Sequence, residues 1–185
     1  MLALLSGGNI EVNRLDDALF DELCAALRAR APSGGEGIKD LEGARCSLTG
    51  ETPFLMACTR GRVECMKLLA GAGCNTRAIN NYGSNALMCV AHSGVAAAVR
   101  TALAAGWCEL EATSIDGSTA FLLACFNGHA KCMKLLAEAG CNTRATNNHG
   151  DNALMCAARS GVAAAVRTAL AAGWCELEAR TEHGN

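Results

Sequence analysis

The chain has 185 residues and a formal net charge of -2, and 51% of its residues are hydrophobic although only 4% are aromatic. This length suits one domain of ordinary size with its own core. The near-neutral charge excludes a broad basic surface for nucleic acid, and no apolar run reaches the ~20 residues of a membrane-spanning helix. Because the first residues also lack the basic flank of a secretory signal, we expect a cytoplasmic protein, with the nucleus as the alternative compartment.

The N-terminal segment, residues 1–49, predicts a degenerate repeat that contains an inserted helix. Leucines recur at every fourth position from Leu15 to Leu27, which indicates an amphipathic helix over residues 12–31. Pro32 and the glycines that follow it predict a flexible, Gly-rich loop.

From residue 50 onward, glycines recur with a fixed period. Steps of 33, 34, 33 and 34 residues separate the members of the series Gly50, Gly83, Gly117, Gly150 and Gly184. Two successive steps make a longer period of 67 residues, because segment 83–116 is identical to segment 150–183 at 27 of 34 positions. This periodicity indicates a solenoid in which each unit must stack on its neighbours to bury its apolar side.

Each unit predicts two helices and a loop. Thr52 is a favourable N-cap, and Pro53 suits the first helical position, because the N–H group that proline lacks would have no partner there. We expect a short helix over Pro53–Thr59, a second helix over residues 62–72 and an extended loop over residues 74–82. The equivalent caps in the other units are Asn85, Thr119 and Asn152.

These motifs resemble the ankyrin repeat. Residues 52–57 read Thr-Pro-Phe-Leu-Met-Ala, and the third unit repeats the same pattern from Thr119 to Gly140. The resemblance covers residues 50–185 and implies an all-α, ankyrin-type helical repeat solenoid of paired antiparallel helices with protruding loop hairpins. The chain departs from the family at the helix-start position, where an apolar residue replaces the usual His. We therefore expect the Thr–His hydrogen bonds that join units in the family to be absent here. The residues at that position are Leu55, Met88, Leu122 and Met155.

We therefore divide the chain into the degenerate repeat 1–49, four ankyrin-type repeats and the start of a further repeat. The four repeats are 50–82, 83–116, 117–149 and 150–183, and the further repeat begins at 184–185. Because no polar capping unit follows residue 183, apolar surface on the last repeat would allow self-association.

No sequence pattern indicates an enzyme, a cofactor site or a metal site. The P-loop, GxGxxG, HExxH and nucleophile-elbow patterns are absent. The four histidines fall at turns or loop tips: His92, His129, His149 and His183. The twelve cysteines follow the repeat register, so we interpret them as small, buried and mostly reduced side chains. A thiol-based sensor is the weaker alternative.

Two further features have a structural interpretation. Trp107 and Trp174 occupy the same turn in the two 34-residue units, and packing beside the inserted residue is favoured over a ligand site. One cation recurs on each second helix, which is typical of a solvated outer face. These cations are Lys67, Arg100, Lys134 and Arg167.

The resemblance implies a protein–protein interaction module, a scaffold or adaptor, that binds a protein partner along the concave face of loop tips and first helices. The alternative is a recognition segment of a larger regulatory enzyme whose catalytic domain lies outside these residues. Packing fixes core positions, so differences between the 67-residue duplicates indicate surface that is free to contact a partner, with Tyr82 and Phe126 as aromatic anchors. The candidate partner-binding residues are Arg60, Tyr82, His92, Ile115, Phe126, Asn127, His149 and Arg159.

Overall fold

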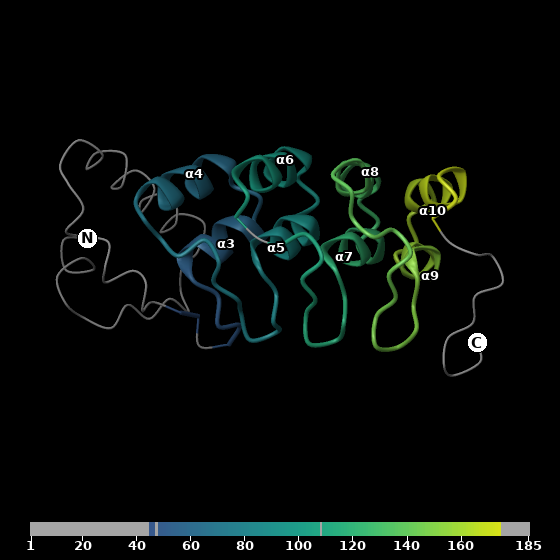
Figure 1. Cartoon of the computed structure of the whole chain (residues 1–185), viewed down its shortest axis with the longest axis horizontal. Helices are drawn as coiled ribbons and strands as arrows, with labels where there is room; N and C mark the ends of the chain where they lie inside the picture. The colour runs from purple at the N-terminus through teal and green to yellow at the C-terminus, as the bar shows by residue number, and fades with distance from the viewer. Residues whose placement is uncertain (1–44, 47, 108, 175–185) are drawn as a thin grey trace.

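The computed structural model describes residues 45, 46, 48–107 and 109–174 (Figure 1). Within these residues, eight helices follow one another and no strand is present. In chain order they are α3 (Pro53–Thr59), α4 (Val63–Gly71), α5 (Ala86–Ser93), α6 (Ala96–Ala105), α7 (Ala120–Phe126), α8 (Ala130–Glu138), α9 (Ala153–Arg159) and α10 (Ala163–Ala171). The predicted all-α solenoid of helix pairs is confirmed. The expected N-terminal helix and the expected start of a further repeat lie outside the described residues.

The helices form two rows (Figure 1). The first helices α3, α5, α7 and α9 pack side by side, and the second helices α4, α6, α8 and α10 form the other row. Each first helix also packs on the second helix of its own unit. The long loops project beyond the row of first helices, so loops and first helices share one side of the solenoid. Among the described residues, no helix is both long and apolar enough to cross a bilayer.

Side-chain caps determine where the first helices begin. Each of the four predicted N-caps accepts a hydrogen bond from the backbone N–H three residues later, as Thr52 does from Leu55 at 3.3 Å. The other pairs are Asn85 with Met88, Thr119 with Leu122, and Asn152 with Met155. Leu55 is fully buried. At this position, where the family has a polar His, the chain therefore has an apolar side chain that packs in the core.

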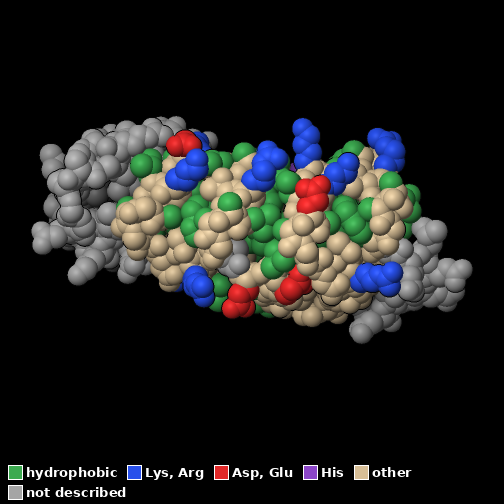
Figure 2. Space-filling view, turned by 45° about the horizontal axis from the view of Figure 1, so that its top comes forward, with side chains coloured by type: hydrophobic (Ala, Val, Ile, Leu, Met, Phe, Trp, Pro, Cys, Tyr) green, Lys and Arg blue, Asp and Glu red, His purple; other side chains and the backbone are tan. Residues whose placement is uncertain are grey.

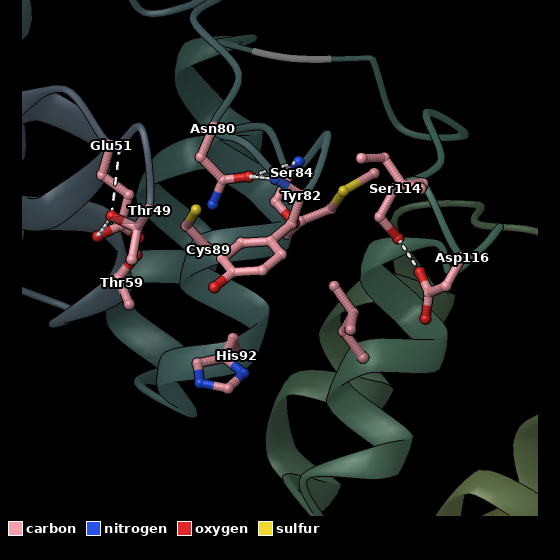
Figure 3. Close-up of a pocket in the computed structure, with 13 residues that line it drawn as sticks. Thr49, Glu51, Thr59, Asn80, Tyr82, Ser84, Cys89, His92, Ser114 and Asp116 are labelled. Carbon is pink, nitrogen blue, oxygen red and sulfur yellow. Dashed lines mark hydrogen bonds between the residues drawn. The ribbon is translucent and has the colours of Figure 1, made fainter. Parts of the chain in front are cut away.

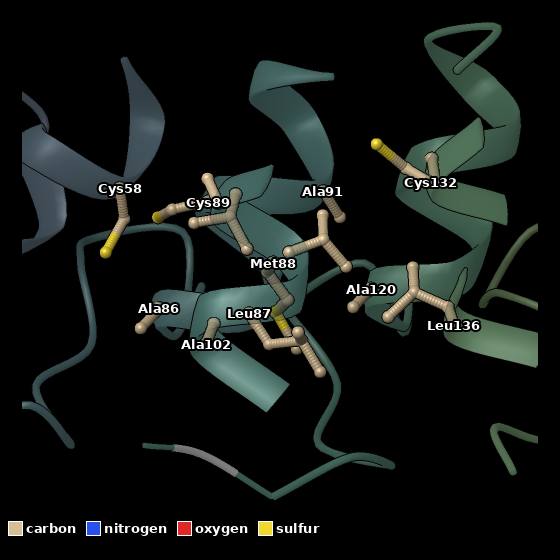
Figure 4. Packing of buried hydrophobic residues seen from close by; sticks show 14 of the residues in the cluster. Cys58, Ala86, Leu87, Met88, Cys89, Ala91, Ala102, Ala120, Cys132 and Leu136 are labelled. Carbon is tan, nitrogen blue, oxygen red and sulfur yellow. The ribbon is translucent and has the colours of Figure 1, made fainter. Parts of the chain in front are cut away.

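Small side chains fill much of the space between the helices (Figure 4). Ala86, Ala91 and Ala102 are buried among the larger side chains of Leu87 and Met88. Side chains of this size let neighbouring helices approach closely at the packing density of a protein interior. The core can therefore be dense although the chain has few aromatic residues.

The two tryptophans join neighbouring units. Trp107 packs edge-on against Phe54, with ring centroids 5.1 Å apart and ring planes at 85°. Trp174 makes the equivalent contact with Phe121 at 5.1 Å and 83°. Both phenylalanines are fully buried, which confirms that these tryptophans pack against the core.

Most of the described cysteines are buried. The buried thiols are Cys58, Cys89, Cys125, Cys132, Cys141 and Cys156, whereas the thiols of Cys46 and Cys74 are half-buried. Burial, reinforced by the carboxylate of Glu111, raises the pKa of Cys141 to about 12. Burial and the carboxylate of Asp151 raise the pKa of Cys156 to about 12 as well. Cys65 departs from the expected pattern, because it is disulfide-bonded.

Candidate functional site

Backbone hydrogen bonds tie each loop tip to the next one. The Asn81 N–H donates to the Thr49 carbonyl oxygen at 2.8 Å, and the Ile115 N–H donates to that of Tyr82 at 3.0 Å. The bond from Asn148 to Asp116, at 2.9 Å, continues the series. Since these bonds fix the tips relative to one another, the tips present their side chains as one continuous row.

Turns within the tips hold Tyr82 and Asp116 in place. The side-chain oxygen of Asn80 accepts hydrogen bonds from the Tyr82 N–H at 3.0 Å and from the Ser84 N–H at 2.9 Å. In the next tip, the Asp116 carboxylate accepts hydrogen bonds from the Ser118 N–H at 3.3 Å and from the Ser114 hydroxyl. Side chains that bond to their own backbone in this way stabilise a turn without help from a regular strand.

A hollow of about 630 Å³ lies between these tips and the first helices α3, α5 and α7 (Figure 3). We call it the concave groove and define it by the lining residues Glu51, Tyr82, Met88, His92, Ile115, Asp116 and Leu123. It spans three successive units, so residues far apart in the sequence converge on it. A groove of this size can hold a few side chains of a partner segment.

The centre of the concave groove is apolar. Met88 is buried at its base and Leu123 is half-buried. Tyr82 and Ile115 line the groove from the loop tips and are 59% and 73% exposed. Exposed apolar side chains that gather around one hollow are typical of a binding surface, whereas single ones are not.

Two carboxylates lie on opposite sides of Tyr82 (Figure 3). Glu51 accepts hydrogen bonds from the Thr59 hydroxyl at 2.7 Å and from the Thr49 hydroxyl at 3.3 Å. Partial burial acts to raise the pKa of Asp116, but hydrogen bonds from Ser114 and Ser118 outweigh it and hold that pKa below its usual value. Asp116 is therefore charged at neutral pH, and the hydroxyl groups fix the orientation of both carboxylates.

Five of the eight predicted partner-binding residues lie in or beside the concave groove. Tyr82, His92 and Ile115 line it. The Asn127 side-chain amide lies 3.2 Å from Nδ1 of His92 and also donates to the Leu123 carbonyl oxygen. Phe126 ends α7 and is 50% exposed. Tyr82 and Ile115 thus lie on loop tips, whereas the other three lie at the C-terminal ends of α5 and α7.

The other three predicted residues do not line the groove. Arg60 follows α3 as its C-cap, and His149 is exposed at a later loop tip. The Arg159 guanidinium lies 3.3 Å from the Asp151 carboxylate, whose side chain is only 3% exposed. Because Oδ1 of Asp151 is buried without a hydrogen-bond donor, the positive charge of Arg159 has a structural role there.

The sequence analysis did not include Glu51, Asp116, Met88 or Leu123 among the candidate residues. The first two occupy positions at which the 67-residue duplicates differ, since Ser118 is the counterpart of Glu51. That difference was a usable signal. Met88 and Leu123 gave no such signal, because core positions and the base of a groove have the same apolar character. Among the described residues, no group of three or more His, Cys, Asp or Glu is arranged to hold a metal ion.

A comparison with known families agrees with this architecture. The model of a family described as ankyrin repeats, in three copies, matches residues 33–106 and 90–177. The two matches together cover well over half of the chain and include every described helix. The chain belongs to the ankyrin-repeat family.

Proposed function

We propose that this chain is a protein-interaction module, a scaffold or adaptor, that holds a protein partner along the concave groove and the adjoining loop tips. The observation that carries the proposal is the convergence of the exposed Tyr82 and Ile115 side chains on one hollow. Ankyrin repeats generally serve as protein–protein interaction modules, and rigid stacked units suit that purpose.

The predicted residues then divide into two groups. Tyr82 and Phe126 supply the aromatic contact area that hot spots of binding energy commonly need. His92 and Asn127 are polar groups between them, and their mutual contact at 3.2 Å fixes the edge of the surface. The remaining candidates, Arg60, His149 and Arg159, do not line the groove, so their truncation is expected to cost little binding energy.

A capture experiment with the chain as bait tests this assignment. The Tyr82→Ala and Phe126→Ala variants are expected to weaken partner binding by about 2 kcal/mol each while leaving the melting temperature nearly unchanged, because both side chains are at least half exposed. The control is Lys67→Ala with Lys134→Ala, on the row of second helices. If the control pair abolishes binding and the aromatic variants do not, the concave-face assignment is wrong.

A further inference from the structure

The concave groove is lined by carboxylates and by no Lys or Arg among the described residues. These carboxylates are those of Glu51 and Asp116. The ion pairs formed between described residues are Lys67 with Glu64 and Arg159 with Asp151, which involve neither groove carboxylate. Hydroxyl groups orient the two carboxylates but do not neutralise them. The groove therefore combines an apolar centre with two carboxylates that form no ion pair with a described Lys or Arg.

The row of second helices has the opposite character. Figure 2 shows Lys and Arg side chains gathered over these helices. The exposed cations of this row are Lys67, Arg100, Lys131, Lys134 and Arg167, against the exposed carboxylates Glu64 and Glu138. The exposed cations Arg77, Arg144 and Arg159 lie outside this row, but none of them lines the groove. The carboxylates of the groove therefore attract a cationic ligand locally, whereas the cations of the outer face repel it.

We infer that the concave groove binds a partner segment in which an apolar side chain is flanked by Lys or Arg. The apolar side chain would lie between Tyr82 and Ile115 above Met88, and its basic neighbours would pair with Glu51 and Asp116. This inference rests on the proposed function and specifies the chemistry of the partner. An acidic segment would meet like charges on both sides of Tyr82, which disfavours binding.

Random peptides displayed on phage are a probe that needs no knowledge of the natural partner. Selection on the whole chain is expected to enrich peptides that combine an apolar residue with adjacent Lys or Arg. The Tyr82→Ala variant is expected to bind a selected peptide about tenfold or more weakly. Its matched control is His149→Ala, since His149 is the counterpart of Tyr82 one 67-residue period later and does not line the groove.

The charges are tested separately. The Glu51→Gln and Asp116→Asn variants each lose one charge and are expected to bind the selected peptide about two- to fivefold more weakly than the wild-type chain. Added salt should reduce this difference in affinity. Glu138→Gln, a carboxylate on the outer α8, is the control and should leave the affinity unchanged. The circular dichroism melting curve of each variant shows whether it is folded.

The possible outcomes separate the two proposals. The selected peptides can be enriched in Asp or Glu, or can be uncharged and still depend on Tyr82 for binding. Either result overturns the inference that basic residues flank the apolar side chain, and leaves the concave groove as the binding surface. If the selected peptides no longer bind the variant with Lys67→Ala and Lys134→Ala, but still bind the Tyr82→Ala variant, the proposed function itself is overturned. Failure to enrich any peptide on the wild-type chain relative to Tyr82→Ala also overturns the inference.

Discussion

The two halves of the duplication share a scaffold and differ on their concave side. In the first half, the Glu51 carboxylate accepts a hydrogen bond from the Thr59 hydroxyl, and Tyr82 lines the concave groove. In the second half, the counterpart of Tyr82 is His149, and a buried carboxylate, Asp151, is paired with a cation. Differences at a few tip and helix-end positions thus place two carboxylates at the groove in the first half, and a buried carboxylate paired with an exposed arginine in the second. In such a repeat, packing specifies the fold, while binding chemistry is set at positions that packing leaves free.

The largest expected effect tests the shared scaffold. Phe54→Ala and Phe121→Ala should each lower the free energy of unfolding by about 3–5 kcal/mol, because both rings are fully buried and contact a tryptophan. Denaturant titration followed by tryptophan fluorescence measures the loss. Phe126→Ala, at a half-exposed ring, is the control and should cost about 0.5 kcal/mol or less. Clearly unequal losses at Phe54 and Phe121 would show that the halves are not equivalent scaffolds.

A thiol that precedes the duplication and a thiol in its second half should differ in reactivity. Hydrogen bonds to the side chain and backbone of Thr49 lower the pKa of Cys46, whereas burial raises that of Cys156 from 9.0 to about 12. Near neutral pH, the thiolate fraction of Cys156 should be about a thousandfold below that of an unshifted thiol. Labelling of the native chain with a thiol reagent, followed by mass spectrometry of the fragments, should find Cys46 modified early and Cys156 late. Early modification of Cys156 would contradict its burial.

The same pKa values give a pH dependence of stability. The folded-state pKa values of Cys141 and Cys156 lie above their unfolded value of 9.0, so these thiols favour the folded state fully below pH 9. As the pH rises from 9 towards 12, the unfolded chain releases these protons first, and the free energy of unfolding should fall. Denaturant titrations at several pH values in this range measure how steeply the free energy of unfolding falls with pH. This fall should be shallower in the Cys156→Ala variant, and an unchanged fall would exclude the Cys156 thiol as one of its causes.

The smallest expected effect addresses the ion pair that distinguishes the halves. Arg159→Ala leaves the Asp151 carboxylate buried without its cation and should cost about 1–2 kcal/mol, a value reduced for the partial exposure of the arginine. His92→Ala, at the equivalent position of the first half, should cost about 0.5 kcal/mol or less. Asp151→Ser combined with Arg159→His recreates the Ser84 and His92 pair and should recover most of the loss. If the double variant is no more stable than the Arg159→Ala variant, loss of the ion pair does not explain the lower stability of Arg159→Ala.

The sequence predicted most of the fold because its signals were local. The glycine period located the units, and the helix expected at Pro53–Thr59 begins and ends at those residues. The second helix was expected over residues 62–72, whereas α4 covers Val63–Gly71. The start differs because Arg62 has non-helical backbone angles and makes no side-chain capping bond, a conformation that its residue type does not indicate.

The site was predicted less completely, because its geometry depends on contacts between units. Tyr82 and Ile115 were found from their positions in the repeat, and the structure places both at the groove. The role of Arg159 could not be found in this way, because the burial of Asp151 depends on neighbouring helices. Likewise, the sequence does not show that Thr59 and Thr49 orient the Glu51 carboxylate, since those contacts depend on the folding of the loop.

The alternating loop tips set a length scale for any partner. The Asn81 side-chain amide donates to the Leu48 carbonyl oxygen at 3.3 Å, and that of Asn148 donates to the Ile115 carbonyl oxygen at 3.1 Å. At this one tip position, an amide (Asn81, Asn148) therefore alternates with an apolar side chain, and the apolar Leu48 and Ile115 are 81% and 73% exposed. A ligand that contacts the apolar side chains of this position must advance by two units from one contact to the next, which is the period of the duplication.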